Sequence, residues 1–172
     1  MKIIACDFRQ AGPILAIFND AILNSTALYD YEPRTPAFME EWFRAKEAGH
    51  YPVFGAVDDD GALAGFASYG PFRHFPAYKY TVEHSVYVHP EKRGRGVGKA
   101  LLRELIAAAT VREYHTLVGA IDSANAASIA LHAGFGFAPC GTIRQAGFKF
   151  GRWLDFEFHQ LLLPTPDHPV DG

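Results

Sequence analysis

Cysteine is scarce in this chain of 172 residues, which has only Cys6 and Cys140, far apart in the sequence. Two cysteines cannot build the disulfide framework of a small secreted domain, so we expect both to be reduced. Long hydrophobic runs are also lacking, and no segment approaches the ~20 apolar residues of a membrane helix. The apolar start meets Asp7 and Arg9 too early for a signal peptide.

An excess of positive charge is missing as well. The formal net charge is −3, so no basic field favours nucleic acid. We therefore expect a cytoplasmic protein with no nucleic-acid and no membrane partner, whose ligands are small molecules. Hydrophobic residues make up 49% of the chain, which supplies a large core without crosslinks.

Hydrophobic periodicity predicts an ordered series of helices and strands. The expected helices cover residues 9–23, 35–49, 97–109 and 126–132, and the expected strands 51–57, 63–69, 78–88, 116–121, 135–143 and 153–163. Thr35 and Pro36 begin the second helix, and Asp58 to Gly61 joins two strands as a hairpin. This order is typical of one mixed α/β domain, of the α+β kind, over residues 1–163. The proline-rich tail, residues 164–172, is expected to be loose.

The most informative segment is a glycine-rich turn that follows a strand and opens a helix, Arg93-Gly94-Arg95-Gly96-Val97-Gly98-Lys99. Glycines let backbone N–H groups approach an anion, and the helix N-terminus adds about half a positive charge. The turn therefore suits a diphosphate. A Walker loop would need glycine at Arg93, and a dinucleotide fingerprint would need it at Lys99 or Leu101, so both are excluded. The alternative is a solvated surface turn.

The spacing Arg93, Gly96, Gly98 after a Val-x-Val strand resembles the acetyl-CoA loop of the GNAT acetyltransferases. The segment from Asn125 to Phe137 resembles a second GNAT motif. This resemblance implies the GNAT fold, with a central, mostly antiparallel sheet flanked by helices, and acetyl-CoA as co-substrate. It implies cofactor contacts from Val86, Tyr87, Val88, Arg93, Gly94, Arg95, Gly96, Val97, Gly98, Lys99, Asn125 and Ser128. Asn125 could equally cap the short helix that it precedes.

Three further segments are similar to the phosphinothricin and methionine sulfone (sulfoximine) N-acetyltransferases. They are residues 24–27, 80–88 and 147–155. The resemblance implies direct transfer of acetyl, in a ternary complex, to the α-amino group of a small amino-acid-like acceptor. It also implies a homodimer.

Glu83 is the candidate general base. An α-amine is mostly protonated at pH 7 and attacks only when neutral, so a nearby carboxylate that accepts its proton assists the reaction. The matching glutamate of the subgroup has this role. The alternative is a surface glutamate paired with Lys79 or Arg73.

His132 occupies the position where many GNAT enzymes have a tyrosine that protonates the leaving thiolate. A histidine there could donate a proton, hold coenzyme A or only pack. Backbone N–H groups around Val86 and Val88 are implied as the oxyanion site, which needs a locally splayed strand.

The acceptor pocket is expected to contain Arg73, His74, Phe75, Glu83, His84 and Ser85. Arg73 is the first candidate for the substrate carboxylate, because a guanidinium binds a carboxylate with two hydrogen bonds. Lys149 lies in the late motif without an assigned contact.

Other chemistries fit the sequence less well. The spacing of His74, His84 and His89 suits no common metal site, and no nucleophile pattern predicts an acyl-enzyme. Two alternatives stay open. One is a GNAT enzyme that acetylates a polyamine, an aminoglycoside or a peptide N-terminus, and the other is a non-catalytic sensor of coenzyme A.

Overall fold

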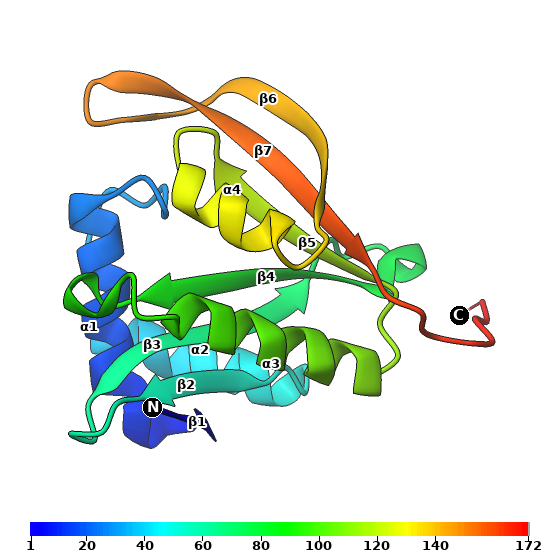
Figure 1. Cartoon of the computed structure of the whole chain (residues 1–172), viewed down its shortest axis with the longest axis horizontal. Coiled ribbons are helices and arrows are strands. Elements are labelled where there is room, and N and C mark those ends of the chain that lie inside the picture. Colours follow the sequence, from blue (N-terminus) through cyan, green and yellow to red (C-terminus); the bar gives the residue numbers. More distant parts are fainter. Residues whose placement is uncertain (172) are drawn as a thin grey trace. The chain divides into compact units, whose positions relative to one another are not determined.

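A computed structural model describes residues 1–171 (Figure 1). Seven strands of this part of the chain form one sheet in the order β1-β2-β3-β4-β5-β7-β6. The strands are β1 (Lys2–Ala5), β2 (Val53–Val57), β3 (Leu63–Pro71), β4 (Thr81–Val88), β5 (Thr116–Asp122), β6 (Ala138–Lys149) and β7 (Arg152–Leu162). The helices are α1 (Ala11–Asn24), α2 (Pro36–Ala48), α3 (Val97–Val111) and α4 (Ala126–Ala133), with 3-10 turns η1 (Phe8–Gln10), η2 (Pro76–Tyr78) and η3 (Pro90–Lys92).

The described strand pairs are antiparallel except for β4 with β5, which run parallel. This agrees with the expected mixed, mostly antiparallel sheet. Contacts divide the chain into two units, Met1–Ser68 with Val86–Glu104, and Tyr69–Ser85 with Leu105–Gly172. The single domain over residues 1–163 therefore stays a prediction.

The first unit is built around aromatic and aliphatic side chains of α1, α2, β2 and β3. Phe66 is fully buried, and its ring lies 4.7 Å from that of Phe18 and 5.3 Å from that of Tyr87. Met39 from α2 and Ile14 from α1 close the same cluster. Each large apolar side chain buried in this way contributes about 1.5–3 kcal/mol.

The helix cap and the hairpin turn predicted for this unit are present in the structure. The Thr35 hydroxyl accepts the Phe38 N–H at 3.2 Å, and Gly49 ends α2. In the β2–β3 hairpin, the Asp58 carboxylate accepts the N–H of Ala62 at 2.9 Å. Gly61 takes a φ of +83°, which favours glycine.

The second unit is centred on β5, which pairs with β7 in register from Thr116/Leu162 to Asp122/Phe156. The long β6–β7 hairpin, orange in Figure 1, extends from this pairing. Asn125 begins α4 and Gly134 ends it, as predicted.

The structure corrects several element boundaries. β1 was not predicted, because four residues carry too weak a pattern. β4 begins at Thr81 instead of residue 78, because the Tyr78 and Lys79 N–H groups donate to Phe75 and Pro76 carbonyls in η2. β6 begins at Ala138 instead of residue 135, because the N–H groups of 135–137 still bond to the last turn of α4.

The tail is not loose over its described residues. The Thr165 hydroxyl donates to the Tyr114 carbonyl at 2.6 Å, and the Val170 N–H donates to the Tyr80 hydroxyl at 3.1 Å. These bonds connect the tail to the residues that precede β4 and β5.

Candidate active site

The glycine-rich turn has the backbone that an anion site requires. Gly94 and Gly96 take φ angles of +74° and +79°, and a Cβ added at either would meet only open space. α3 begins at the next residue, Val97, so its first N–H groups have no partner within the helix. These amides and the helix dipole together favour a negatively charged group in front of the turn.

The basic side chains of the turn differ in their surroundings. The Arg93 guanidinium lies 3.7 Å from the Asp20 carboxylate, and its Nε donates to the Val88 carbonyl at 3.4 Å. Arg95 and Lys99 are exposed. The first amides of α3, the open space at both glycines and these cations fit the diphosphate of coenzyme A, which the residues from Arg93 to Lys99 would hold.

Gly65 on β3 helps to shape the backbone before the turn, and it was not singled out from the sequence. A Cβ added there would lie 2.7 Å from the Tyr87 carbonyl oxygen and 3.0 Å from a Val97 methyl group. Only glycine therefore lets β3 approach β4 so closely, just before the turn. A glycine inside a strand pattern is the available signal for such an approach.

Glu83 lies half-buried on β4, in the second unit. Burial raises the pKa of its carboxyl, and the positive charge of Arg73 acts in the opposite direction. Arg73, His74 and Phe75 belong to the exposed loop before β4, and Ser85 is half-buried on the strand. The structure thus places Arg73 close enough to Glu83 to act on its charge.

The parallel pairing of β4 with β5 runs from Thr81/Thr116 to His84/Gly119 in the described register. β4 itself continues through Val86 and Tyr87 to Val88. The implied oxyanion groups therefore lie on β4 beyond the last described pair. A single strand carries both the candidate base and these backbone groups.

His84 is not placed where it was expected. Successive side chains of a strand point to opposite faces, so His84 faces away from Glu83. It is 6% exposed, and its Nε2 lies 2.9 Å from Nε2 of His132. The predicted acceptor residue is instead half of a buried histidine pair.

The residues expected to hold coenzyme A from α4 have internal partners. The Asn125 side chain accepts the Ser128 N–H at 3.1 Å, which is the helix cap given above as its alternative role. A side chain that caps a helix keeps its amide group for further contacts.

Lys149 is buried, with its ammonium 5.0 Å from the centre of the Phe150 ring.

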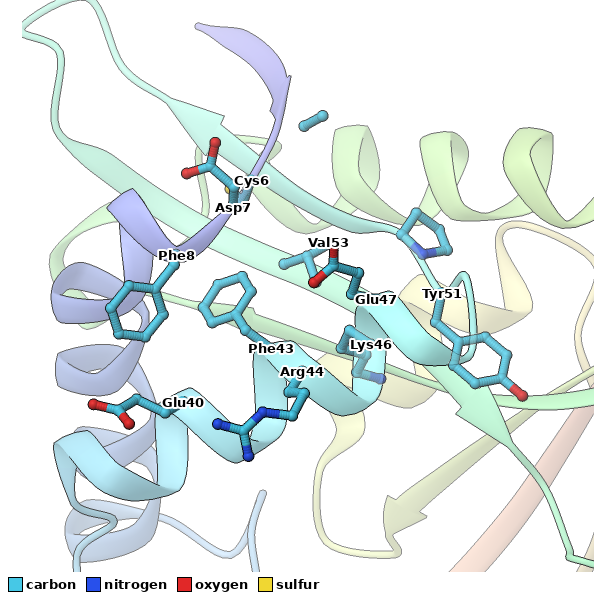
Figure 2. Close-up of a pocket in the computed structure, with 12 residues that line it drawn as sticks. Cys6, Asp7, Phe8, Glu40, Phe43, Arg44, Lys46, Glu47, Tyr51 and Val53 are labelled. Atoms are coloured by element: carbon cyan, nitrogen blue, oxygen red, sulfur yellow. The ribbon is translucent and has the colours of Figure 1, made fainter.

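A separate pocket of about 630 Å³ lies in the first unit, between α2 and the end of β1 (Figure 2). None of the predicted site residues lines it. The Phe8 and Phe43 rings form part of its wall, 5.9 Å apart and nearly perpendicular. Burial lowers the pKa of Lys46 to about 8 and raises that of the Cys6 thiol to about 11, with Asp7 adding to the latter.

Within the described part of the chain, no three His, Cys, Asp or Glu side chains form a group that could hold a metal ion. Among residues 1–171, no helix has the length and hydrophobicity needed to cross a membrane.

Comparison with known proteins agrees with this geometry. Residues 18–137 match the model of the acetyltransferase (GNAT) family. The chain is 48% identical to the L-methionine sulfoximine/L-methionine sulfone acetyltransferase of Pseudomonas paraeruginosa, over 96% of this chain and 100% of that protein.

Two solved structures are also similar. An acetyltransferase from Acinetobacter baylyi has 56% identity and a TM-score of 0.97, over 99% of this chain and 97% of that one. A phosphinothricin acetyltransferase from Sinorhizobium meliloti, solved with acetyl-CoA, has 35% identity and a TM-score of 0.94, over 99% and 92% of the chains.

This chain belongs to the GNAT acetyltransferase family. It is an acetyl-CoA-dependent N-acetyltransferase, which confirms the predicted family, fold, enzyme class and co-substrate.

Proposed function

We propose that this enzyme acetylates the α-amino group of a small amino-acid-like acceptor of the methionine sulfone, methionine sulfoximine or phosphinothricin type. The activities of its relatives support this choice. The observation that carries it is Glu83, a half-buried carboxylate of raised pKa beside the cationic Arg73. This pair can accept a proton from an ammonium group while binding a carboxylate or phosphinate.

The proposed mechanism divides the work between β4 and the loop before it. Arg73 binds the acceptor's acidic group, with His74, Phe75 and Ser85 around it, and Glu83 takes the proton from the amine. Backbone N–H groups of Val86 and Val88 polarise the acetyl carbonyl. Acetyl-CoA bound at Arg93–Lys99 would supply the activated acetyl group, and Asn125 and Ser128 would contact its pantetheine. As the C–N bond forms, the C–S bond breaks and coenzyme A leaves as the thiolate.

Direct transfer, without an acyl-enzyme, is part of the proposal. The Cys6 thiol, whose pKa is about 11, is protonated at pH 7 and is therefore a poor nucleophile. We expect the double variant Cys6→Ser, Cys140→Ser to keep its turnover. Loss of chemistry in a folded double variant would contradict direct transfer.

A thiol-release assay tests the acceptor. Acetyl-CoA is supplied with methionine sulfone, methionine sulfoximine, phosphinothricin, spermidine, an aminoglycoside or a short peptide. Release with one of the first three supports the proposal. Thiol release with spermidine, the aminoglycoside or the peptide indicates a GNAT enzyme that acts on another kind of amine. Binding of coenzyme A without thiol release from any acceptor indicates a non-catalytic sensor.

The variant Glu83→Gln tests the base. We expect kcat to fall by about 10²–10⁴, the usual contribution of a general base, while acetyl-CoA affinity stays unchanged. Glu91→Gln, at an exposed glutamate of η3, is the matched control. Wild-type turnover in Glu83→Gln would remove the assignment.

We also propose a homodimer in the cytoplasm. The β6–β7 hairpin exposes large apolar side chains, which favours an interface there. They are Ile143, Phe148, Phe150, Trp153 and Leu162. The two free cysteines suit a reducing compartment. Light scattering after gel filtration tests the dimer, and a monomeric mass would overturn it.

A further inference from the structure

The buried pair of His84 and His132 has a hydrogen-bond pattern that defines its protons. Nδ1 of His132 lies 2.7 Å from the Ser128 carbonyl oxygen. A carbonyl only accepts, so this nitrogen carries the hydrogen. A neutral His132 therefore has a bare Nε2.

The bare nitrogen faces His84. The two Nε2 atoms are 2.9 Å apart, which is a hydrogen-bond distance, so Nε2 of His84 must be the donor. Both nitrogens of His132 are then in use. A proton could join His132 only at Nε2, where the N–H of His84 already points.

The surroundings keep this pair buried and close together. Phe137 packs against both rings, with ring centres 5.2 Å from His84 and 5.1 Å from His132. A Cβ added at Gly119 would lie 3.1 Å from His84 and 3.3 Å from His132, so glycine leaves the room that the pair occupies.

A further titratable group that acts on the pair, His159, lies on β7. His159 is buried, and its Nε2 lies 3.0 Å from a Glu157 carboxylate oxygen. Burial lowers the pKa of His132, the Ser128 carbonyl acts in the opposite direction, and a positive charge on His159 would lower this pKa further. Burial and the neighbouring His132 lower the pKa of His84 to about 3, although the Val118 carbonyl acts to raise it.

We propose that His84 is a positioning residue that donates its Nε2 hydrogen to His132 and so holds His132 as the neutral Nδ1–H tautomer during acetyl transfer. This rests on the proposed acetyl transfer and on the family resemblance, which implies that His132 lies at the coenzyme A end of the reaction. This arrangement argues against proton donation to the thiolate from a charged His132 ring. His84 touches no reacting atom and acts through its partner.

Nitrogen NMR of protein labelled with ¹⁵N-histidine tests the tautomers directly and does not depend on any acceptor. We expect His132 to be neutral and protonated at Nδ1, and His84 neutral and protonated at Nε2, at pH 6 and above. The variants His84→Gln and His132→Gln assign the signals. A charged His132 at pH 6, or one protonated at Nε2, would overturn the proposal.

Kinetics of three variants separate positioning from packing. Glutamine at position 84 keeps an amide donor near the place of Nε2, whereas leucine has none. The variant Gly119→Ala adds a methyl group that would press against both rings. We expect the ratio of kcat at pH 8 to kcat at pH 6 to rise at least tenfold in His84→Leu and Gly119→Ala. It should stay within about threefold of wild type in His84→Gln.

The control is His168→Gln, at an exposed position near the C-terminus, which should leave the ratio unchanged. Equal effects of glutamine and leucine at position 84, or pH-independent losses, would show a packing role and sink the proposal. If wild type released no thiol with the proposed acceptors, the proposed function would fail, while the NMR result would still decide the tautomers.

Discussion

Acid should destabilise this protein through His84. Its pKa is about 3 in the folded protein, because of burial and the neighbouring His132. The ordinary value of 6.5 applies to the unfolded chain. Between these two values the unfolded state binds more protons, so the free energy of unfolding falls as pH decreases through this window.

The size of the effect follows from the two pKa values. Relative to pH 8, the loss attributable to His84 is about 2 kcal/mol at pH 5 and about 3 kcal/mol at pH 4. Above pH 6.5 the contribution is constant, and below pH 3 it reaches its full value. Such a loss is a large part of the free energy of unfolding of a typical domain.

Urea unfolding of wild type and of His84→Gln at pH 8, 6 and 5 measures the contribution of His84 to this loss of stability. Glutamine does not titrate and keeps a donor to His132, and His132 and His159 are present in both proteins. The stability of the variant relative to wild type should therefore increase by about 2 kcal/mol between pH 8 and pH 5. If the two proteins lose stability in parallel, His84 does not lose a proton on folding, and the reasoning is refuted.

Other substitutions test the core, the turn and the acceptor loop. Phe66→Ala should cost about 3–5 kcal/mol in urea unfolding, since the side chain is fully buried; a loss below 1 kcal/mol would contradict the core. Gly96→Val should weaken coenzyme A binding at least tenfold by calorimetry, because valine is strained at a φ of +79°. Its control is Gly12→Ala, where an added Cβ faces open space at the start of α1. This variant should keep its affinity for coenzyme A and raise the free energy of unfolding by about 0.5–1 kcal/mol. Arg73→Gln should raise KM for the acceptor tenfold or more and leave KM for acetyl-CoA unchanged; equal changes in both would reject the carboxylate contact.

The helices α2 and α4 were predictable because their ends carry local signals. Thr35 and Asn125 accept N–H groups of the first turn of their helices, and Gly49 and Gly134 lie just past the last turn. Strand boundaries were harder, because pairing partners far along the chain decide them. β1 is a strand because it pairs with β2, and its four residues have no pattern of their own.

The candidate site divides in the same way. The turn and Glu83 became candidates from residue types, spacing and the family resemblance, and their roles stay predictions. The partners of His84 could not be identified in this way, because His132 is 48 residues away and Gly119 belongs to a third element. Only the folded arrangement shows that a missing side chain on β5 makes room for two rings.

The alternation of β4 explains why neighbouring residues have such different roles. Glu83 and Ser85 share one face of the strand, and His84 between them points to the other. The carboxylate therefore keeps its place near Arg73 while the imidazole meets α4. A shift of β4 by one residue would exchange the two faces, which would bury a carboxylate beside Phe137 and separate the two histidines. The pairing of His84 with His132 therefore helps to fix the register that turns Glu83, the candidate base, to the opposite face of β4.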